Sequence, residues 1–350
     1  KPYTDSVRWD IERYIFFCKA VLAAMPVIGF HPDIIHCHDW QTGMIPVFLK
    51  STFATHSFYW GTKSIMTIHN LKFQGVWDID HFIYNTNLPG YMFTPDKLEF
   101  KKDANMLKGG LVYADYITTV SETYAEEIKT PYYGEQLDGL LCARSRSLRG
   151  ILNGIDYSVY NPETDPKIAV HYNEKNAIAK KKEAKRALQK ELGLPVDDNK
   201  FMIAIISRLT DQKGLDLVDW ITERIVDEFT QFVIIGTGES RYEDMFRYYQ
   251  GRFPDRVSAN IFYSDALAHK LYAAADAMLV PSRFEPCGLT QLISLRYGTV
   301  PIVRETGGLK DTVEPYNEFE KCGTGFTFHN YNADDLLYTI NYAKNIYFNH

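Results

Sequence analysis

The sequence of 350 residues has no surplus of positive charge, no paired cysteine motif and no long apolar run. Its 38 Lys and Arg face 44 Asp and Glu, a net charge of -6 that argues against general binding to nucleic-acid backbones. The apolar runs reach only the length of a strand, so we expect no transmembrane helix. Five cysteines without CxxC spacing are typical of a reduced protein rather than of a disulfide scaffold.

Motifs of common nucleotide and metal chemistry are missing as well. There is no GxxxxGK[ST] phosphate loop, which argues against an NTPase. Residues 236–238 (GTG) follow a predicted strand but complete only part of the GxGxxG fingerprint of nicotinamide enzymes. His36 and His38 flank Cys37, but side chains alternate along a strand, so the three cannot bind one zinc ion and we expect no metal.

What the sequence does contain is two series of apolar, β-branched runs that alternate with helical patterns. Such runs are typical of parallel sheets covered by helices on both faces. Helices are predicted at 10–28, 41–50 and 214–228, and strands or strand–helix units at 32–40, 63–70, 114–128, 148–156, 200–210, 231–238, 257–265, 271–282, 299–308 and 323–330.

A polar, Lys-rich stretch at 161–200 separates the two series. We interpret it as a linker followed by a solvated helix rather than as a patch for an anionic partner. The sequence therefore predicts two doubly wound α/β domains, residues 1–157 and 158–330, with residues 331–350 beginning a C-terminal helix. In such a pair the ligand is expected in the cleft between the domains, at the carboxyl ends of strands.

Polar side chains stand at the predicted strand ends of the first series. Asp39 follows the first strand, His69 the second, and Asn153 a later one that closes with an Asn-Gly turn. Because the carboxyl ends of parallel strands meet at one edge of a sheet, these residues are candidates for a ligand site.

The second series carries candidates for an anion site. Arg208 and Lys213 share a predicted strand-to-helix loop with Gly214, which suits a diphosphate, although a surface loop with two solvated bases fits the motif equally well. Glu285 precedes a Cys-Gly-Leu-Thr helix start. Tyr263 ends a predicted strand and could stack on a base, although an aromatic there is more often core or rim.

Seven segments, in order along the whole chain, resemble one family. They are HCHDWQTGMIPVFLK, TIHNLKFQG, GLVYADYITTVSETYAEEI, ILNGIDYSVYNPETD, SRLTDQKGLDLV, LVPSRFEPCGLTQL and VRETGGLKDTV. The sequence is similar to bacterial glycogen synthases and plant starch synthases. The resemblance implies the GT-B fold of two Rossmann-like domains. It also implies glucose transfer from ADP-glucose to the non-reducing end of an α-1,4-glucan (glycogen), with retention of configuration and without a cofactor.

The resemblance implies contacts with the transferred glucose. Asp39 and His69 would touch this sugar, and Asn153 would lie near it. Glu285 would lie close to the glucose 3- and 4-hydroxyl groups and the reacting centre.

The resemblance also implies contacts with the nucleotide. Arg208 and Lys213 would bind the diphosphate and stabilise its departure, and Tyr263 matches the position that stacks on adenine. Backbone donors from two glycine-bearing helix starts would line the glucose and phosphate: Cys287, Gly288, Leu289, Thr290, Thr306, Gly307 and Gly308.

Two features depart from wider family patterns. Many retaining GT-B transferases carry a second Glu eight residues after the first, and Ile293 stands there, in agreement with the glycogen and starch synthase branch. The amino-terminal KxGGL motif is absent, and TGGL at 306–309 is its second-domain counterpart. We therefore expect the first βα units to be missing. We also expect the helix from 331–350, which usually returns toward the first domain, to be cut short.

The Glu285 motif offers no second carboxylate, so we favour a front-face reaction over a double displacement. Alternative readings are an inactive fragment or glucan-binding remnant, a related transferase using UDP-glucose, and an epimerase or dehydrogenase with an incomplete glycine fingerprint. The reduced cysteines and the resemblance predict the bacterial cytoplasm, or a plastid if a transit peptide preceded the chain. The sequence does not indicate the oligomeric state.

Overall fold

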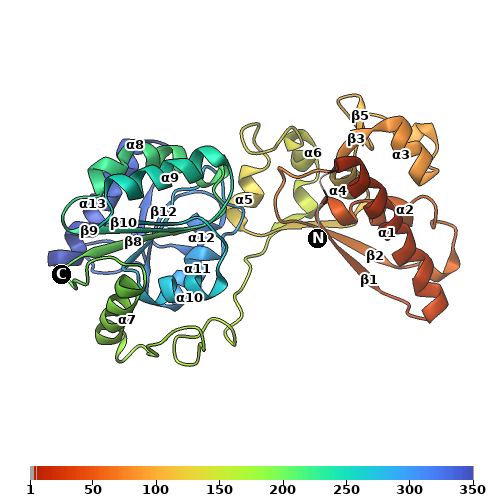
Figure 1. The fold of residues 1–350 in the computed structure, drawn as a ribbon. Coiled ribbons are helices and arrows are strands. Elements are labelled where there is room, and N and C mark those ends of the chain that lie inside the picture. The colour runs from red at the N-terminus through yellow and green to blue at the C-terminus, as the bar shows by residue number, and fades with distance from the viewer. Residues whose placement is uncertain (1–3, 5, 350) are drawn as a thin grey trace. The chain divides into compact units, whose positions relative to one another are not determined.

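The computed structural model describes residue 4 and residues 6–349, and the chain divides into two compact units, Lys1–Leu152 and Asn153–His350 (Figure 1). The predicted boundary after residue 157 thus lies a few residues inside the second unit. Within the described residues, no helix combines the length and apolar character needed to cross a membrane. Each unit has its own sheet and its own hydrophobic core.

The first unit is built on a parallel sheet with the strand order β1-β2-β6-β7. Its strands are β1 (Ile34–His38), β2 (Lys63–Ile68), β6 (Tyr116–Thr119) and β7 (Leu148–Gly150). Its helices include α1 (Val7–Ile28), α2 (Met44–Leu49), α4 (Met106–Tyr113), α5 (Glu122–Glu127) and α6 (Asp138–Ala143). A small antiparallel sheet with α3 (Ile79–Thr86) follows β2, and the apolar pattern did not predict it; its strands are β3 (Val76–Asp78), β4 (Glu99–Phe100) and β5 (Asp103–Asn105).

Local signals set the ends of several elements in this unit. The Ser6 hydroxyl caps the start of α1, and Gly29 ends the helix in the left-handed region at φ 68°. The helix predicted at 41–50 instead divides at Gly43 into a 3-10 turn, η1 (Trp40–Thr42), and the short α2. A Cβ at Gly43 would lie 2.2 Å from the Met106 carbonyl oxygen, so this close approach of two backbones requires glycine.

The second unit contains a six-stranded parallel sheet with the order β10-β9-β8-β11-β12-β13. Its strands are β8 (Phe201–Ile206), β9 (Thr230–Ile235), β10 (Val257–Asn260), β11 (Ala277–Val280), β12 (Val300–Arg304) and β13 (Phe326–Phe328). Its helices are α7 (Ala177–Glu191), α8 (Leu215–Ile225), α9 (Ser240–Arg252), α10 (Asp265–Ala274), α11 (Thr290–Arg296), α12 (Gly307–Thr312) and α13 (Ala333–Asn349).

Both faces of this sheet are buried, as the continuous apolar runs predicted. Phe201, Ile203 and Ile205 of β8 belong to the core shared with α8, α9 and α13. Met202 and Ala204 belong to the opposite core, shared with α7, α10 and α11 (Figure 1). Side chains alternate along a strand, so a strand with helices on both sides must be apolar throughout.

Two elements differ from expectation. The strand predicted at 257–265 stops at Asn260, because the Ser264 hydroxyl accepts the Leu267 N–H and starts α10. The predicted solvated helix, α7, buries Lys185, whose ammonium lies 2.8 Å from the Asp276 carboxylate. The C-terminal α13 packs on α8 and β13 of its own unit, and its return toward the first unit stays a prediction.

Candidate active site

In the first unit, strand register brings Asp39 to His69. His38 pairs with Thr67 across β1 and β2, so the residues that follow these strands are neighbours. The Asp39 Oδ1 atom accepts the backbone N–H groups of His69 (2.8 Å) and Asn70 (3.4 Å). Asp39 has a φ of 55°, which is strained for a residue with a Cβ and is common at functional positions. Burial raises the pKa of its carboxyl above the ordinary value.

Two imidazoles, those of His38 and His69, act on this carboxylate, and a third, that of His36, lies against His38. The His38 Nδ1 and His69 Nε2 atoms are 3.0 Å apart, and the His36 and His38 ring centroids are 4.2 Å apart. Burial first, and then the two neighbouring imidazoles, lower the pKa of His38, which favours the neutral form of its ring. His36 and His38 share the exposed face of β1 and Cys37 is buried on the other face. Among the described residues, no group of three or more side chains forms a metal site.

The loop after β2 is fixed by buried contacts. Leu71 donates its backbone N–H to the Tyr124 hydroxyl oxygen at 3.2 Å. Gly75 lies against the Trp40 indole, since a Cβ there would be 2.3 Å from the ring atom Cε3. Trp40 follows Asp39 directly, so the aromatic residue of the HDW motif serves to hold the loop that carries His69 and Asn70.

In the second unit, Lys213 and Glu285 form an ion pair. The Lys213 Nζ and Glu285 Oε2 atoms are 2.6 Å apart, and the Ser282 hydroxyl donates to the same oxygen at 2.8 Å. Their side chains are 18% and 9% exposed. Lys213 belongs to the 3-10 turn η5 (Asp211–Lys213) after β8, and Glu285 follows β11. Because β8 and β11 are adjacent strands, two residues far apart in the sequence meet at one sheet edge.

Arg208 lies on the same loop as Lys213 but is left open. It is exposed, and no described residue makes a hydrogen bond or ion pair with its guanidinium. Gly214, at φ 69°, would place a Cβ 2.1 Å from the Pro281 carbonyl oxygen, so the loop lies directly on the β11 loop. A guanidinium without a described partner and a partly buried ammonium on one loop are groups that can neutralise a diphosphate.

The segment after Glu285 presents free backbone donors. Gln291 Nε2 donates to the Cys287 and Gly288 carbonyl oxygens, both at 2.9 Å, which holds these carbonyls toward α11. The N–H groups of Cys287, Gly288 and Leu289 have no acceptor among the described residues. Three adjacent open amides form a site for an anionic or hydroxyl oxygen.

The start of α12 packs tightly on this segment. A Cβ at Gly307 would lie 2.1 Å from the Glu285 carbonyl oxygen, and one at Gly308 would lie 2.2 Å from the Cys287 carbonyl oxygen. Gly308 donates its N–H to the Glu285 and Pro286 oxygens, both at 3.1 Å. The glycine pair therefore fixes the position of the Glu285 loop.

In comparisons with known proteins, each unit matches a family of sugar-transferring enzymes. A family model described as starch synthase catalytic domain matches residues 1–143, and one described as glycosyl transferases group 1 matches residues 186–346. A glycogen synthase of Lachnospira eligens is 64% identical over 350 residues, which are 100% of this chain and 73% of that protein. A glycogen synthase of Lachnoclostridium phytofermentans is 62% identical over 99% of this chain and 72% of that protein.

The chain belongs to the glycogen synthase family. Its fold also matches the catalytic domain of starch synthase IV from Arabidopsis thaliana, which is bound to ADP and acarbose. The TM-score is 0.92 at 34% identity, over 99% of this chain and 72% of that one. A sucrose-phosphate synthase from Thermosynechococcus elongatus shares the fold alone, with a TM-score of 0.59 at 20% identity. The predicted resemblance, the GT-B fold and the assignment as a hexosyltransferase of glycogen synthesis are confirmed.

In this glycogen synthase family member, two of the predicted backbone donors already have acceptors within the chain. Besides Gly308, Thr306 also uses its N–H internally, donating to the Arg304 carbonyl oxygen at 2.9 Å. Their role as donors to the glucose or phosphate stays a prediction. Thr290 is the first residue of α11, where a helix leaves its N–H groups without internal acceptors.

Two further predicted residues lie in loops. Tyr263 is 86% exposed and sits between β10 and α10 rather than at a strand end. Asn153, the first residue of the second unit, makes hydrogen bonds that lower the pKa of the Cys287 thiol, although burial outweighs them and raises it. The sequence had given no sign that Asn153 and Cys287 are neighbours.

Proposed function

We propose that the chain transfers glucose from ADP-glucose to the non-reducing end of an α-1,4-glucan such as glycogen, with retention of configuration. The observation that carries this proposal is the second unit's cationic loop, with Lys213 fixed on Glu285 and Arg208 open. The starch synthase structure of the same fold is bound to ADP and acarbose, a pairing that agrees with an adenine nucleotide and a sugar chain as ligands.

The proposed role of the cations is to stabilise the leaving ADP. When the bond between the anomeric carbon and the diphosphate breaks, negative charge grows on the phosphate oxygens. Arg208 and Lys213 would neutralise it, and the open amides of Cys287 to Leu289 would donate to the phosphate or glucose oxygens. These groups replace a metal ion in the proposal, so activity should survive treatment with a chelator.

The remaining steps follow the front-face route. The acceptor 4-hydroxyl group forms its bond to the anomeric carbon on the side that ADP leaves, and its proton passes to the departing phosphate. Glu285 orients Lys213 and receives the glucose hydroxyl groups. For the first unit, we propose that Asp39 and His69 bind the glucose, which fits a carboxylate whose position two backbone N–H groups already fix.

The proposal is tested with radiolabelled ADP-glucose and glycogen. We expect glucan extension that is insensitive to EDTA, and a Tyr263→Ala variant with a KM for ADP-glucose raised about tenfold and a kcat close to that of the parent. Trp60→Ala, which removes an exposed aromatic residue of the first unit, is the matched control and should leave both constants unchanged. Transfer from UDP-glucose alone would overturn the donor assignment, and glucan binding without transfer would favour a binding remnant.

The compartment stays a prediction from the sequence. A bacterial cytoplasm fits the reduced cysteines and the bacterial sources of both relatives named above, and a plastid is the alternative.

A further inference from the structure

The second unit also carries a groove whose lining residues are separate from the site residues described above. It has a volume of about 1040 Å³ and runs between α8 and the start of α13, with one residue from α9. We call it the α8–α13 groove. Its lining residues are Asp216, Leu217, Asp219, Trp220, Glu223, Arg224, Tyr249, Tyr331, Asn332, Ala333 and Asp334.

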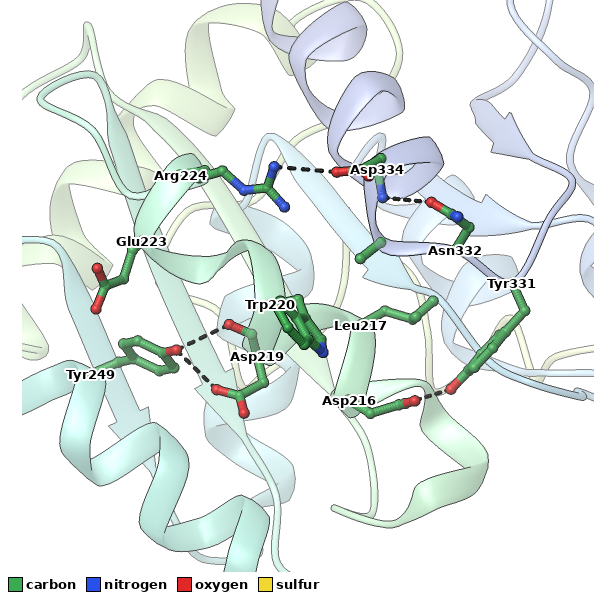
Figure 2. Close-up of a pocket in the computed structure, with 11 residues that line it drawn as sticks. Asp216, Leu217, Asp219, Trp220, Glu223, Arg224, Tyr249, Tyr331, Asn332 and Asp334 are labelled. Atoms are coloured by element: carbon green, nitrogen blue, oxygen red, sulfur yellow. Dashed lines mark hydrogen bonds and ion pairs between the residues drawn. The ribbon is translucent and has the colours of Figure 1, made fainter.

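Trp220 is the most unusual residue of this groove. Its side chain is 79% exposed on α8, and no described residue makes a ring or cation contact with it. Figure 2 shows its indole in the middle of the groove, between the Tyr249–Asp219 pair and the Asp216–Tyr331 pair. An aromatic face held open to water contributes little to the fold, and inside a groove lined by acceptor oxygens it offers a stacking surface to a ligand.

Carboxylates fixed in place surround the indole. The Asp219 carboxylate accepts the Tyr249 hydroxyl at 2.9 Å, and Asp334 pairs with Arg224 at 3.2 Å (Figure 2). Each keeps further lone pairs free to accept hydroxyl groups. Four carboxylates line the groove against one guanidinium, and Asp216 and Glu223 pair with Arg283 and Arg252 from just outside it. The groove therefore offers acceptor oxygens and no unpaired lining cation, which disfavours a phosphate, a nucleic acid or an anionic lipid.

A second groove continues from the first. It has a volume of about 540 Å³, shares Asp334, and is lined by Tyr338, which is 74% exposed, as well as by Thr327 and His329. Two exposed aromatic residues, Trp220 and Tyr338, therefore lie along adjoining grooves. This arrangement suits a long polymer better than a single small molecule.

We propose that the α8–α13 groove binds an internal stretch of the α-1,4-glucan. A pyranose ring offers an apolar face of C–H groups and a rim of hydroxyl groups, which match an exposed indole and a rim of carboxylates. This proposal rests on the proposed function for the identity of the polymer. Holding the polymer here raises the effective concentration of its chain ends near the enzyme, without any contact to the reacting sugar.

The test is Trp220→Ala, which removes an exposed side chain and leaves the core intact. In affinity electrophoresis through glycogen-containing gels, we expect the apparent affinity to fall about fivefold to tenfold. The KM for glycogen should rise by a similar factor, while the KM values for ADP-glucose and maltotetraose stay unchanged. Adding Tyr338→Ala should weaken glycogen binding further. Trp60→Ala, at a 68% exposed tryptophan of the first unit, is the matched control and should bind like the parent.

Three results would overturn the proposal. They are unchanged glycogen binding by Trp220→Ala, an equal loss in Trp60→Ala, or a loss of self-association in Trp220→Ala without a loss of glycogen binding. Asp219→Asn, which keeps the shape of the side chain, provides a second variant and should also weaken binding. The electrophoresis measures binding alone, so it decides the matter even if the chain fails to transfer glucose.

Discussion

Replacing Lys213 with Met leaves the Glu285 carboxylate 9% exposed, with the Ser282 hydroxyl as its remaining side-chain partner among the described residues. At 2.6 Å and an effective dielectric constant of about 20, the lost attraction is about 6 kcal/mol before desolvation is counted. Both groups lose hydration on folding, and Lys213 stays 18% exposed. We therefore expect a net loss of about 3 kcal/mol in the free energy of unfolding, the low end for a broken buried pair.

A double-mutant cycle measures this coupling. Lys213→Met and Glu285→Gln should each lower the melting temperature of the second unit by about 6–12 °C, at about 2–4 °C per kcal/mol. The double variant should lose less than the sum of the two, with a coupling of about 2 kcal/mol. Hydrogen exchange of the β8 amides reports on the second unit alone, because the chain has two units.

Activity completes the cycle. All three variants should lose about 100-fold or more in kcat, because each lacks at least one charge of the pair. The double variant restores packing but not the charge. Additive losses of stability would refute the coupling. A normal kcat in the double variant would show that the ion pair is not needed for catalysis.

Three further outcomes are expected. Arg208→Ala should reduce kcat about 100-fold and shift melting by less than about 1 °C, since the guanidinium has no partner among the described residues; a normal kcat would exclude it from the diphosphate site. Gly307 has a φ of 44° and faces the Glu285 carbonyl, so Gly307→Ala should lower the free energy of unfolding by about 3 kcal/mol and remove most of the activity. A Cβ at Gly139 meets open space, so Gly139→Ala should preserve stability and activity. Equal melting temperatures of the two variants would contradict this. Burial lowers the pKa of Lys181 to about 7, so between this pH and about pH 10 the unfolded state binds a proton that the folded state has released. The free energy of unfolding, measured in urea and compared with that of Lys181→Met, should therefore rise with pH across this window. A difference that does not change with pH would exclude the shift.

The first unit shows how far a strand pattern predicts a site. Asp39 and His69 were candidates because each follows an apolar run, and the observed register of β1 and β2 joins them by a hydrogen bond. The same pattern did not predict the small antiparallel sheet at residues 76–105, whose strands have two or three residues. Strands this short have no periodicity to detect, since their pairing rather than their composition defines them.

The second unit shows what the strand order adds. Lys213 and Glu285 are 72 residues apart, and β9 and β10 lie between their loops in the sequence. They meet because β11 inserts beside β8, and that choice depends on which sheet faces and helices pack together. The N–H groups of Thr306 and Gly308 have acceptors for a related reason, because neighbouring carbonyl groups come close to them only in the fold.

By itself, the sequence determined the alternation of strands and helices in the two main sheets, the division into two α/β units and the family, because apolar periodicity and motif order are local properties. The tertiary structure alone decided which charges are paired, which amides stay open and which aromatic residues face water. Those properties arise from groups distant along the chain, whose hydrogen bonds and desolvation depend on where the packed sheet places them.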